Sequence, residues 1–289
     1  MEVLLAAASA FFFALGTVLQ QKGAVREPAG SARGAAALLL RLARRPVWLG
    51  GILADALGFL LQAVALAIGK LVVVQPILAT SVVFSLPLGT RLTAQRISRR
   101  DVVAAIAVTL GLAIFLVVGD PAGGRDDAPV GEWLVAVIPI AAVSALLFAA
   151  GWRARPAVKA TLLGTAAGVF FGLSAALTKA TVDQLDEGIL HVLVDWHLYA
   201  LLAVGYAGMT LSEIALGTGV LAPAIATFSI LDAVTSVVLG ITLLQESLRD
   251  DVVGIALCGA ALGVMFAGLA VLAGSEGAHQ EPEPSTPGG

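Results

Sequence analysis

A single acidic residue inside an apolar stretch is the strongest candidate for chemistry in this sequence. Asp232 lies near the middle of 220–244, a segment long enough to cross a bilayer as a helix. A carboxylate at this depth costs about 2.5–3.5 kcal/mol on an insertion scale, so we expect Asp232 to face protein or water. Ser229, Thr235 and Ser236 share its helix face. This polar stripe predicts a pathway through the membrane, with Asp232 as the candidate ligand of any metal ion.

Further polar residues inside apolar spans are candidates for the same pathway. Asp55 and Gln62 lie seven residues apart, hence on one helix face, and Glu213 lies near the end of another span. Intramembrane ionisable groups are functional candidates, although Asp55 and Glu213 could instead pair with helix ends or reach the interface. The predicted pathway residues are Asp232, Asp55, Glu213, Gln62, Ser85, Thr80, Thr227 and Gln75, with Pro76 and Pro223 as predicted helix breaks.

The composition places these residues in a helical membrane protein. Of 289 residues, 58% are hydrophobic and 13% are charged, against about 25% charged in a typical soluble domain. The single cysteine, Cys258, excludes an internal disulfide framework, and the three histidines show no metal-ligand spacing. The sequence has no P-loop, no dinucleotide fingerprint and no HExxH motif. We therefore expect no enzymatic activity, no cofactor and no nucleic-acid partner.

Apolar stretches predict nine transmembrane helices. They fall at about 3–19, 47–68, 71–92, 102–118, 133–150, 160–177, 197–216, 220–244 and 252–273. The segment 30–45 has too short an apolar core to span and is flanked by arginines, which favours an interfacial helix. If 30–45 spans instead, there are ten helices and the N-terminus lies inside rather than outside. The acidic, proline- and glycine-rich segment 274–289 predicts a disordered cytoplasmic tail.

The two halves of the chain resemble each other. Residues 4–22 (LLAAASAFFFALGTVLQQK) align without a gap on 162–180 (LLGTAAGVFFGLSAALTKA). Five helices separate the two starts, so the second copy is predicted to be inverted, a plan typical of secondary transporters. The predicted architecture is thus four helices, a connector and four helices. Its units are 1–131, the connector helix at 132–157, the inverted repeat at 158–273 and the tail at 274–289.

The repeat extends to the proline-bearing spans, where 74–80 is echoed by 221–227. In this register Ser85 corresponds to Asp232, and we expect the two side chains to face one central cavity from opposite copies. Such a site between repeats is the usual place for substrate in this class of transporter.

Small residues at four-residue spacing predict close packing between helices. Gly164, Gly168 and Gly172 form one such ridge, which we interpret as a packing feature without chemistry of its own. Gly259 and Gly263 form a shorter one. This second ridge could serve a homodimer or an intrachain contact, and we favour the intrachain contact.

Basic residues are concentrated in alternate loops. The loops after the first, third and fifth predicted helices, with their adjoining helix ends, carry 13 of the 17 basic residues. The positive-inside rule places these loops in the cytoplasm, the N-terminus outside and the C-terminus inside. We therefore predict a multi-pass protein of the plasma (inner) membrane, surrounded by the lipid bilayer.

The proline-bearing helix and the glycine-rich last helix resemble the drug/metabolite transporter (EamA-like) superfamily. Residues 240–248 (GITLLQESL) are similar to its Gly…Leu-x-Glu helix-end signature, while the first copy has Gln95 where glutamate is usual. The layout more closely resembles the NIPA-like magnesium transporter branch, whose Leu-Val-Thr-Pro-Leu-Gly pattern here reads VVQPIL at 73–78. That branch's Gly-Glu-x-x-Asn-Phe stretch is not kept, since Gln62 replaces its asparagine and Phe59 its glutamate.

The resemblance implies a secondary transporter of a small solute or ion, and two substrates compete. In one hypothesis hydrated Mg²⁺, or another divalent cation, moves down the membrane potential, held by Asp232 with Asp55 or Glu213. In the other, Asp232 binds a proton that is exchanged for a small metabolite or drug. A non-transporting membrane scaffold is a third hypothesis, of a different class.

Overall fold

The computed structural model describes residues 1–24, 44–93 and 97–280. Within these ranges nine helices are long and apolar enough to cross a membrane, so the predicted all-α polytopic membrane fold is confirmed. Of the predicted interfacial segment 30–45, all but the last two residues lie outside the described ranges, and Gln95 lies outside them too.

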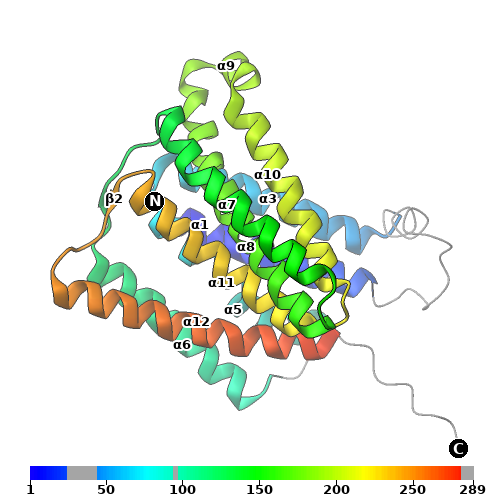
Figure 1. Cartoon of the computed structure of the whole chain (residues 1–289). Helices are drawn as coiled ribbons and strands as arrows, with labels where there is room; N and C mark the ends of the chain where they lie inside the picture. Colours follow the sequence, from blue (N-terminus) through cyan, green and yellow to red (C-terminus); the bar gives the residue numbers. More distant parts are fainter. Residues whose placement is uncertain (25–43, 94–96, 281–289) are drawn as a thin grey trace, which may run out of the picture.

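Figure 1 shows the arrangement of the described helices. Their bounds are α1 Glu2–Ala24, α3 Pro46–Ile68, α4 Leu71–Leu78, α5 Ser81–Leu92, α6 Arg99–Gly119, α7 Val130–Trp152, α8 Pro156–Asp183, the 3₁₀ helix η1 Gln184–Glu187, α9 Ile189–Val194, α10 Trp196–Leu216, α11 Leu221–Thr242 and α12 Val252–Gln280. The short strands β1 (Ala122–Gly123) and β2 (Glu246–Ser247) pair antiparallel and join the loop after α6 to the loop after α11.

Four close helix pairs build the bundle. α1 packs against α3, α8 packs against both α10 and α11, and α6 packs against α12 at one edge of the molecule (Figure 1). The glycine ridge of α8 lies against α11, as its spacing predicts. A Cβ added at Gly172 would lie 2.8 Å from the carbonyl oxygen of Asp232, and one at Gly164 would lie 2.8 Å from that of Ala224. This ridge therefore sets the position of α11, and Asp232 with it.

The second small-residue pair has no such contact. Within the described part of the chain, a Cβ added at Gly259 or Gly263 would meet no atom within 4 Å. The favoured intrachain contact is therefore wrong, because these two glycines lie on a face of α12 that no described helix covers. A homodimer contact there stays a prediction.

The two proline-bearing spans differ. α4 ends at Leu78, two residues after Pro76, and a turn at 79–80 leads into α5. α11, by contrast, begins two residues before Pro223 and continues without interruption to Thr242. The predicted helix break at Pro223 is therefore wrong. Pro223 lies in the first turn, where backbone N–H groups have no intrahelical partner and a missing one is tolerated.

The last helix is longer than the sequence indicated. α12 continues to Gln280, past Gly274, where we predicted the disordered tail to begin. Residues 275–280 (SEGAHQ) contain no proline and include good helix formers, and the first proline of the tail is Pro282. The predicted start of disorder at Gly274 is therefore wrong, and 281–289 lie outside the described residues.

Candidate functional site

A cavity of about 900 Å³ lies between α1, α3, α4, α8, α10 and α11. Its polar lining includes two carboxylates, Asp232 and Glu213, and two amides, Gln62 and Gln75, together with four serines. The aromatic side chains that line it are Phe13, Phe59, Phe171, Tyr206 and Phe228. The cavity therefore combines a broad apolar and aromatic wall with a few acidic and amide groups, and helices from both predicted halves contribute to it.

Asp232 lies on α11 with little to balance its charge. The hydrogen bond that its carboxylate accepts among the described residues comes from the Ser236 hydroxyl, at 3.5 Å. None of the described residues that line the cavity is basic. An isolated carboxylate in a low-dielectric environment is strongly unfavourable unless it binds a proton or a cation. The arrangement therefore leaves Asp232 ready to bind either one.

Gln75 brings an unused hydrogen-bond donor to the same cavity. It is only 2% exposed, and its Nε2 has no hydrogen-bond partner within the described ranges. A buried donor left unpaired costs about 1–3 kcal/mol, so an acceptor on a solute or a water would satisfy it. Gln75 and Asp232 thus offer complementary groups, a donor and an anionic acceptor, to one occupant.

The cavity has a side opening between α3 and α10. The most exposed of its apolar lining residues come from these two helices: Phe59 is 47% exposed, Met209 61% and Tyr206 75%. Glu213, also on α10, is exposed at the same opening. An occupant can therefore reach Asp232 without crossing the closely packed seam between α8 and α11.

The remaining predicted pathway residues do not line the cavity. Asp55 lies where α3 packs against α1, and its carboxylate accepts a hydrogen bond from Gln20 of α1. Helix hydroxyls readily bond to a preceding carbonyl. The three remaining pathway hydroxyls all donate to such a carbonyl: Thr80 to Ile77 at 2.6 Å, Ser85 to Val82 at 2.7 Å, and Thr227 to Pro223 at 2.7 Å.

The expectation that Ser85 and Asp232 face one cavity is therefore wrong. The turn at 79–80 interrupts the first proline-bearing span before Ser85, while α11 runs straight through Asp232. Positions that align in the two sequences therefore do not line the same cavity: Asp232 lines it and Ser85 does not.

At the end of the bundle where α1 begins and α3, α8 and α11 end, polar residues form a second arrangement, which we call the polar end. Glu246 is its centre. Its two carboxylate oxygens accept hydrogen bonds from the backbone N–H groups of Leu71, at 2.7 Å, and Val72, at 2.8 Å. Burial raises the pKa of Glu246, and these two hydrogen bonds offset part of that rise. Glu246 therefore caps the N-terminus of α4 from the loop after α11.

Lys179 performs the opposite capping at the same end. A lysine near a helix end commonly extends to the surface, but Lys179 is 5% exposed. Its Nζ donates to the carbonyl oxygens of Leu66, at 3.2 Å, and Gly69, at 2.8 Å, and pairs with Asp126 at 2.8 Å. A cation at the C-terminus of α3 suits the helix dipole, so Lys179 ties α8 to α3.

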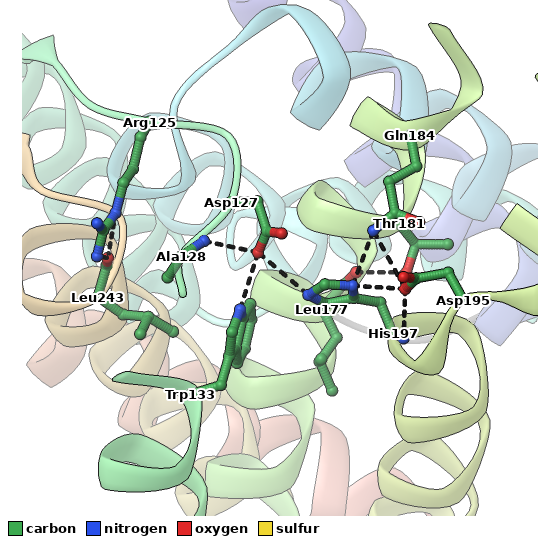
Figure 2. Close-up of polar contacts among 10 residues, drawn as sticks. All are labelled: Arg125, Asp127, Ala128, Trp133, Leu177, Thr181, Gln184, Asp195, His197 and Leu243. Atoms are coloured by element: carbon green, nitrogen blue, oxygen red, sulfur yellow. Dashed lines mark hydrogen bonds and ion pairs between the residues drawn. The ribbon is translucent and has the colours of Figure 1, made fainter. Parts of the chain in front are cut away.

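Arg125, in the loop after α6, extends this network to α11. Its Nη2 donates to the carbonyl oxygen of Leu243 at 2.8 Å, as Figure 2 shows, and its guanidinium also pairs with Glu132. Its backbone N–H bonds to Leu244 at 2.8 Å. The strand pair β1–β2 lies beside these contacts, so the two loops are joined through main-chain and side-chain bonds alike.

His197 lies between two aspartates in the same region (Figure 2). It is 3% exposed; its Nδ1 is 2.6 Å from Asp195 and its Nε2 is 3.1 Å from Asp127. Nε2 is thus close enough to Asp127 for an ion pair, but the two groups are not oriented for a hydrogen bond. Burial acts to raise the pKa of Asp195, but hydrogen bonds from His197 and Gln184 outweigh it and leave that pKa lowered. Trp133 donates to Asp127 at 2.8 Å.

These polar-end residues are not among the candidate site residues predicted from the sequence, which favoured a surface position for Lys179. Glu246 was part of the helix-end signature, which is the signal that could have identified it. His197 and Lys179 had no metal or catalytic spacing around them. In the part of the chain that the structure describes, no group of three or more His, Cys, Asp or Glu could hold a metal ion. The polar-end residues instead connect the ends of helices through hydrogen bonds and ion pairs.

The fold and the cavity define a multi-pass helical membrane protein with an acidic, aromatic central site and a hydrogen-bonded polar end. No family model matches the chain, and no solved structure matches it. An uncharacterized protein of Corynebacterium glutamicum is 32% identical over 255 residues, covering 86% of this chain and 86% of that protein. The chain belongs to the same family as this corynebacterial protein.

Proposed function

We propose that this membrane protein is a secondary transporter that exchanges protons for a small organic solute carrying a positive charge. The observation that supports the proposal best is Asp232, a carboxylate on the wall of a cavity of about 900 Å³ whose described lining holds no basic residue. A proton and a cationic group compete for one carboxylate, because each removes the cost of its charge. Such competition couples the movement of one to the movement of the other.

The size and lining of the cavity favour an organic substrate. Its volume falls in the range of about 300–1,000 Å³ typical of small-molecule sites. Its aromatic rings suit a cationic or aromatic solute, since a cation over a ring face gains about 0.5–2 kcal/mol. Phe171 and Phe228, for example, meet edge to face with centroids 6.3 Å apart. Gln75 adds a donor for a polar group of the same solute.

Magnesium remains the second candidate. Asp232 and Glu213 line the same cavity, and Mg²⁺ needs one or two carboxylates because it keeps several waters. Asp55, the other carboxylate proposed for this role, instead bonds to Gln20 and does not line the cavity. The largely apolar wall gives a hydrated ion few partners, which is why we place the organic substrate first.

The orientation, the inverted repeat and the likeness to the drug/metabolite transporter superfamily belong to this proposal. The basic end, from which α6 and α8 begin, would face the cytoplasm of the plasma (inner) membrane. Single cysteines placed at 22–24 and at 124 test the orientation, with Cys258 replaced by alanine. An impermeant thiol reagent should label position 124 from outside, and labelling of 22–24 from outside instead would reverse the topology.

Transport by the purified protein in liposomes tests the function. A pH gradient should drive uptake of aromatic amines and quaternary ammonium ions, with Mg²⁺ and anionic metabolites measured alongside. Asp232→Asn should abolish this uptake, whereas Asp55→Asn, the same chemical change at a carboxylate outside the cavity, should keep it. Flux of Mg²⁺ alone would favour the second candidate, and no flux of any solute would leave the scaffold hypothesis.

A further inference from the structure

A second cavity, of about 510 Å³, lies apart from the candidate site, in a groove between α6 and α12. Arg99 and Arg100 line part of it, and the rest of its lining is valine, alanine and glycine. The two helices touch at the bottom of the groove, where a Cβ added at Gly268 would lie 2.8 Å from the carbonyl oxygen of Ala104. The groove therefore follows the α6–α12 seam, at the edge of the bundle in Figure 1.

The groove runs from a helix end into the depth of the membrane-spanning part. α6 begins at Arg99, and Ala107, which also lines the groove, comes eight residues later. At 1.5 Å per residue it lies about 12 Å further along the helix. On α12 the lining residues Val264 and Val271 cover a similar length. The arginines thus lie at the level of lipid headgroups, and the valines and alanines at the level of acyl chains.

The charge at the mouth of the groove is positive. Arg99 and Arg100 are exposed, and within the described ranges neither forms an ion pair. The neighbouring carboxylate, Asp101, is 2% exposed and accepts hydrogen bonds from the backbone and hydroxyl of Ser98, each at 2.8 Å. Asp101 therefore completes the N-terminal cap of α6, and within the described residues it forms no ion pair with Arg99 or Arg100.

The walls of the groove are apolar and uncovered. Val103 is 66% exposed and Val264 is 49% exposed, and between them lie the small side chains of Ala107 and Ala267. Two facing rows of valine with alanine between them line an open apolar furrow. In a bilayer, an acyl chain is what lies against such a surface at this depth.

We propose that this groove binds an anionic phospholipid, with its phosphate on Arg99 and Arg100 and one acyl chain along the seam of α6 and α12. Guanidinium groups bind phosphate oxygens in a bidentate manner, and basic pockets between membrane helices recognise anionic headgroups. The combination of an arginine pair and an apolar furrow distinguishes this site from the general attraction between basic loops and acidic membranes. The proposal is independent of which solute the central cavity carries.

Native mass spectrometry of the purified protein tests the site, with phosphatidylglycerol titrated against phosphatidylcholine. Arg99→Gln with Arg100→Gln should weaken retention of phosphatidylglycerol about 30-fold. Ala267→Phe, which fills the furrow from an exposed position, should weaken it without changing any charge; Val103→Phe serves if Ala267→Phe does not fold. Arg153→Gln with Arg155→Gln is the matched control, since it removes the same charge from the loop after α7.

The outcomes separate specific binding from its alternatives. Loss of bound phosphatidylglycerol in the groove variants, with retention in the Arg153 and Arg155 control, is the expected result. Equal weakening in both arginine pairs, with no effect of Ala267→Phe, would overturn the proposal in favour of general basic-end attraction. A wild-type dimer that Ala267→Phe converts to a monomer would also overturn it, because a second copy would then cover the groove.

Discussion

Two carboxylates in this protein, one buried and one half-buried, are held in opposite ways. Glu246 is 2% exposed, and its two oxygens accept hydrogen bonds of 2.7 and 2.8 Å from Leu71 and Val72 at the start of α4. Asp232 lines a cavity and accepts a hydrogen bond of 3.5 Å from Ser236. A carboxylate whose partners are built into the chain stabilises the fold, whereas one left without them is available to a ligand.

The difference follows from what each carboxylate faces. Glu246 points at a helix N-terminus, where unpaired N–H groups and the helix dipole both favour a negative charge. Asp232 lies in the interior of a helix, where the neighbouring backbone groups are already bonded within α11. The comparison teaches that burial alone does not mark a functional acid in a membrane protein. The supply of fixed partners decides it.

The largest effect is expected from Asp232→Asn. It should reduce proton-coupled flux at least about 30-fold, since losing one partner of a buried charge pair costs about 2 kcal/mol or more. The same variant should melt at an unchanged or higher temperature, because an uncompensated buried charge is removed. Flux and melting are measured on the same liposome and detergent preparations. A clear drop in melting temperature would instead make Asp232 a structural residue like Glu246.

Glu246→Ala should show the reverse pattern. It leaves the N–H groups of Leu71 and Val72 buried without acceptors, which costs about 2–6 kcal/mol of stability at about 1–3 kcal/mol each. The melting temperature should fall sharply, and Glu246→Gln, which keeps one acceptor oxygen, should recover part of the loss. Full stability in Glu246→Ala would break the comparison, because the capping role would then contribute nothing.

A smaller effect is expected where the glycine ridge sets the depth of Asp232. A Cβ added at Gly172 would lie 2.6 Å from the Cβ of Thr235, so Gly172→Ala should push α11 away from α8. Overpacking of this kind costs about 1–3 kcal/mol, and coupled flux should fall with it. Gly263→Ala is the control, because its added Cβ meets no described atom within 4 Å. Equal behaviour of the two variants would contradict the positioning role.

The smallest effects are the pH dependences at the polar end, and they have opposite signs. The pKa of Asp195 is lowered, so its contribution to stability is complete above about pH 3.9 and is lost as pH falls through the folded value. The pKa of Glu246 is raised, so the stability linked to its protonated form is complete below about pH 4.3 and is lost as pH rises through the folded value, while its oxygens still accept the two N–H bonds. Melting curves across pH should therefore flatten at low pH in Asp195→Asn and at higher pH in Glu246→Gln. If the melting temperature of either variant changed with pH in the opposite direction, the hydrogen-bond partners assigned to that carboxylate would be wrong.

Much of the architecture could be predicted because a bilayer constrains it strongly. Apolar length alone located the spans: the predicted 47–68 is α3 at Pro46–Ile68, and the predicted 197–216 is α10 at Trp196–Leu216. The spacing of Gly164, Gly168 and Gly172 likewise indicated the contact that α8 makes with α11. These features depend on the chain's own periodicity and on the cost of exposing backbone to lipid, so they can be read locally.

The sequence by itself thus determined the membrane class, the nine described spans and Asp232 as the acid to examine. Only the tertiary structure decided which polar residues meet. Asp55 pairs with Gln20, 35 positions away in the sequence, and Glu246 caps a helix that begins 175 positions earlier. Such partners cannot be read from spacing within one helix, because they depend on how separate helices come together. The satisfaction of a buried charge by distant groups is therefore what separated a structural glutamate from a candidate functional aspartate.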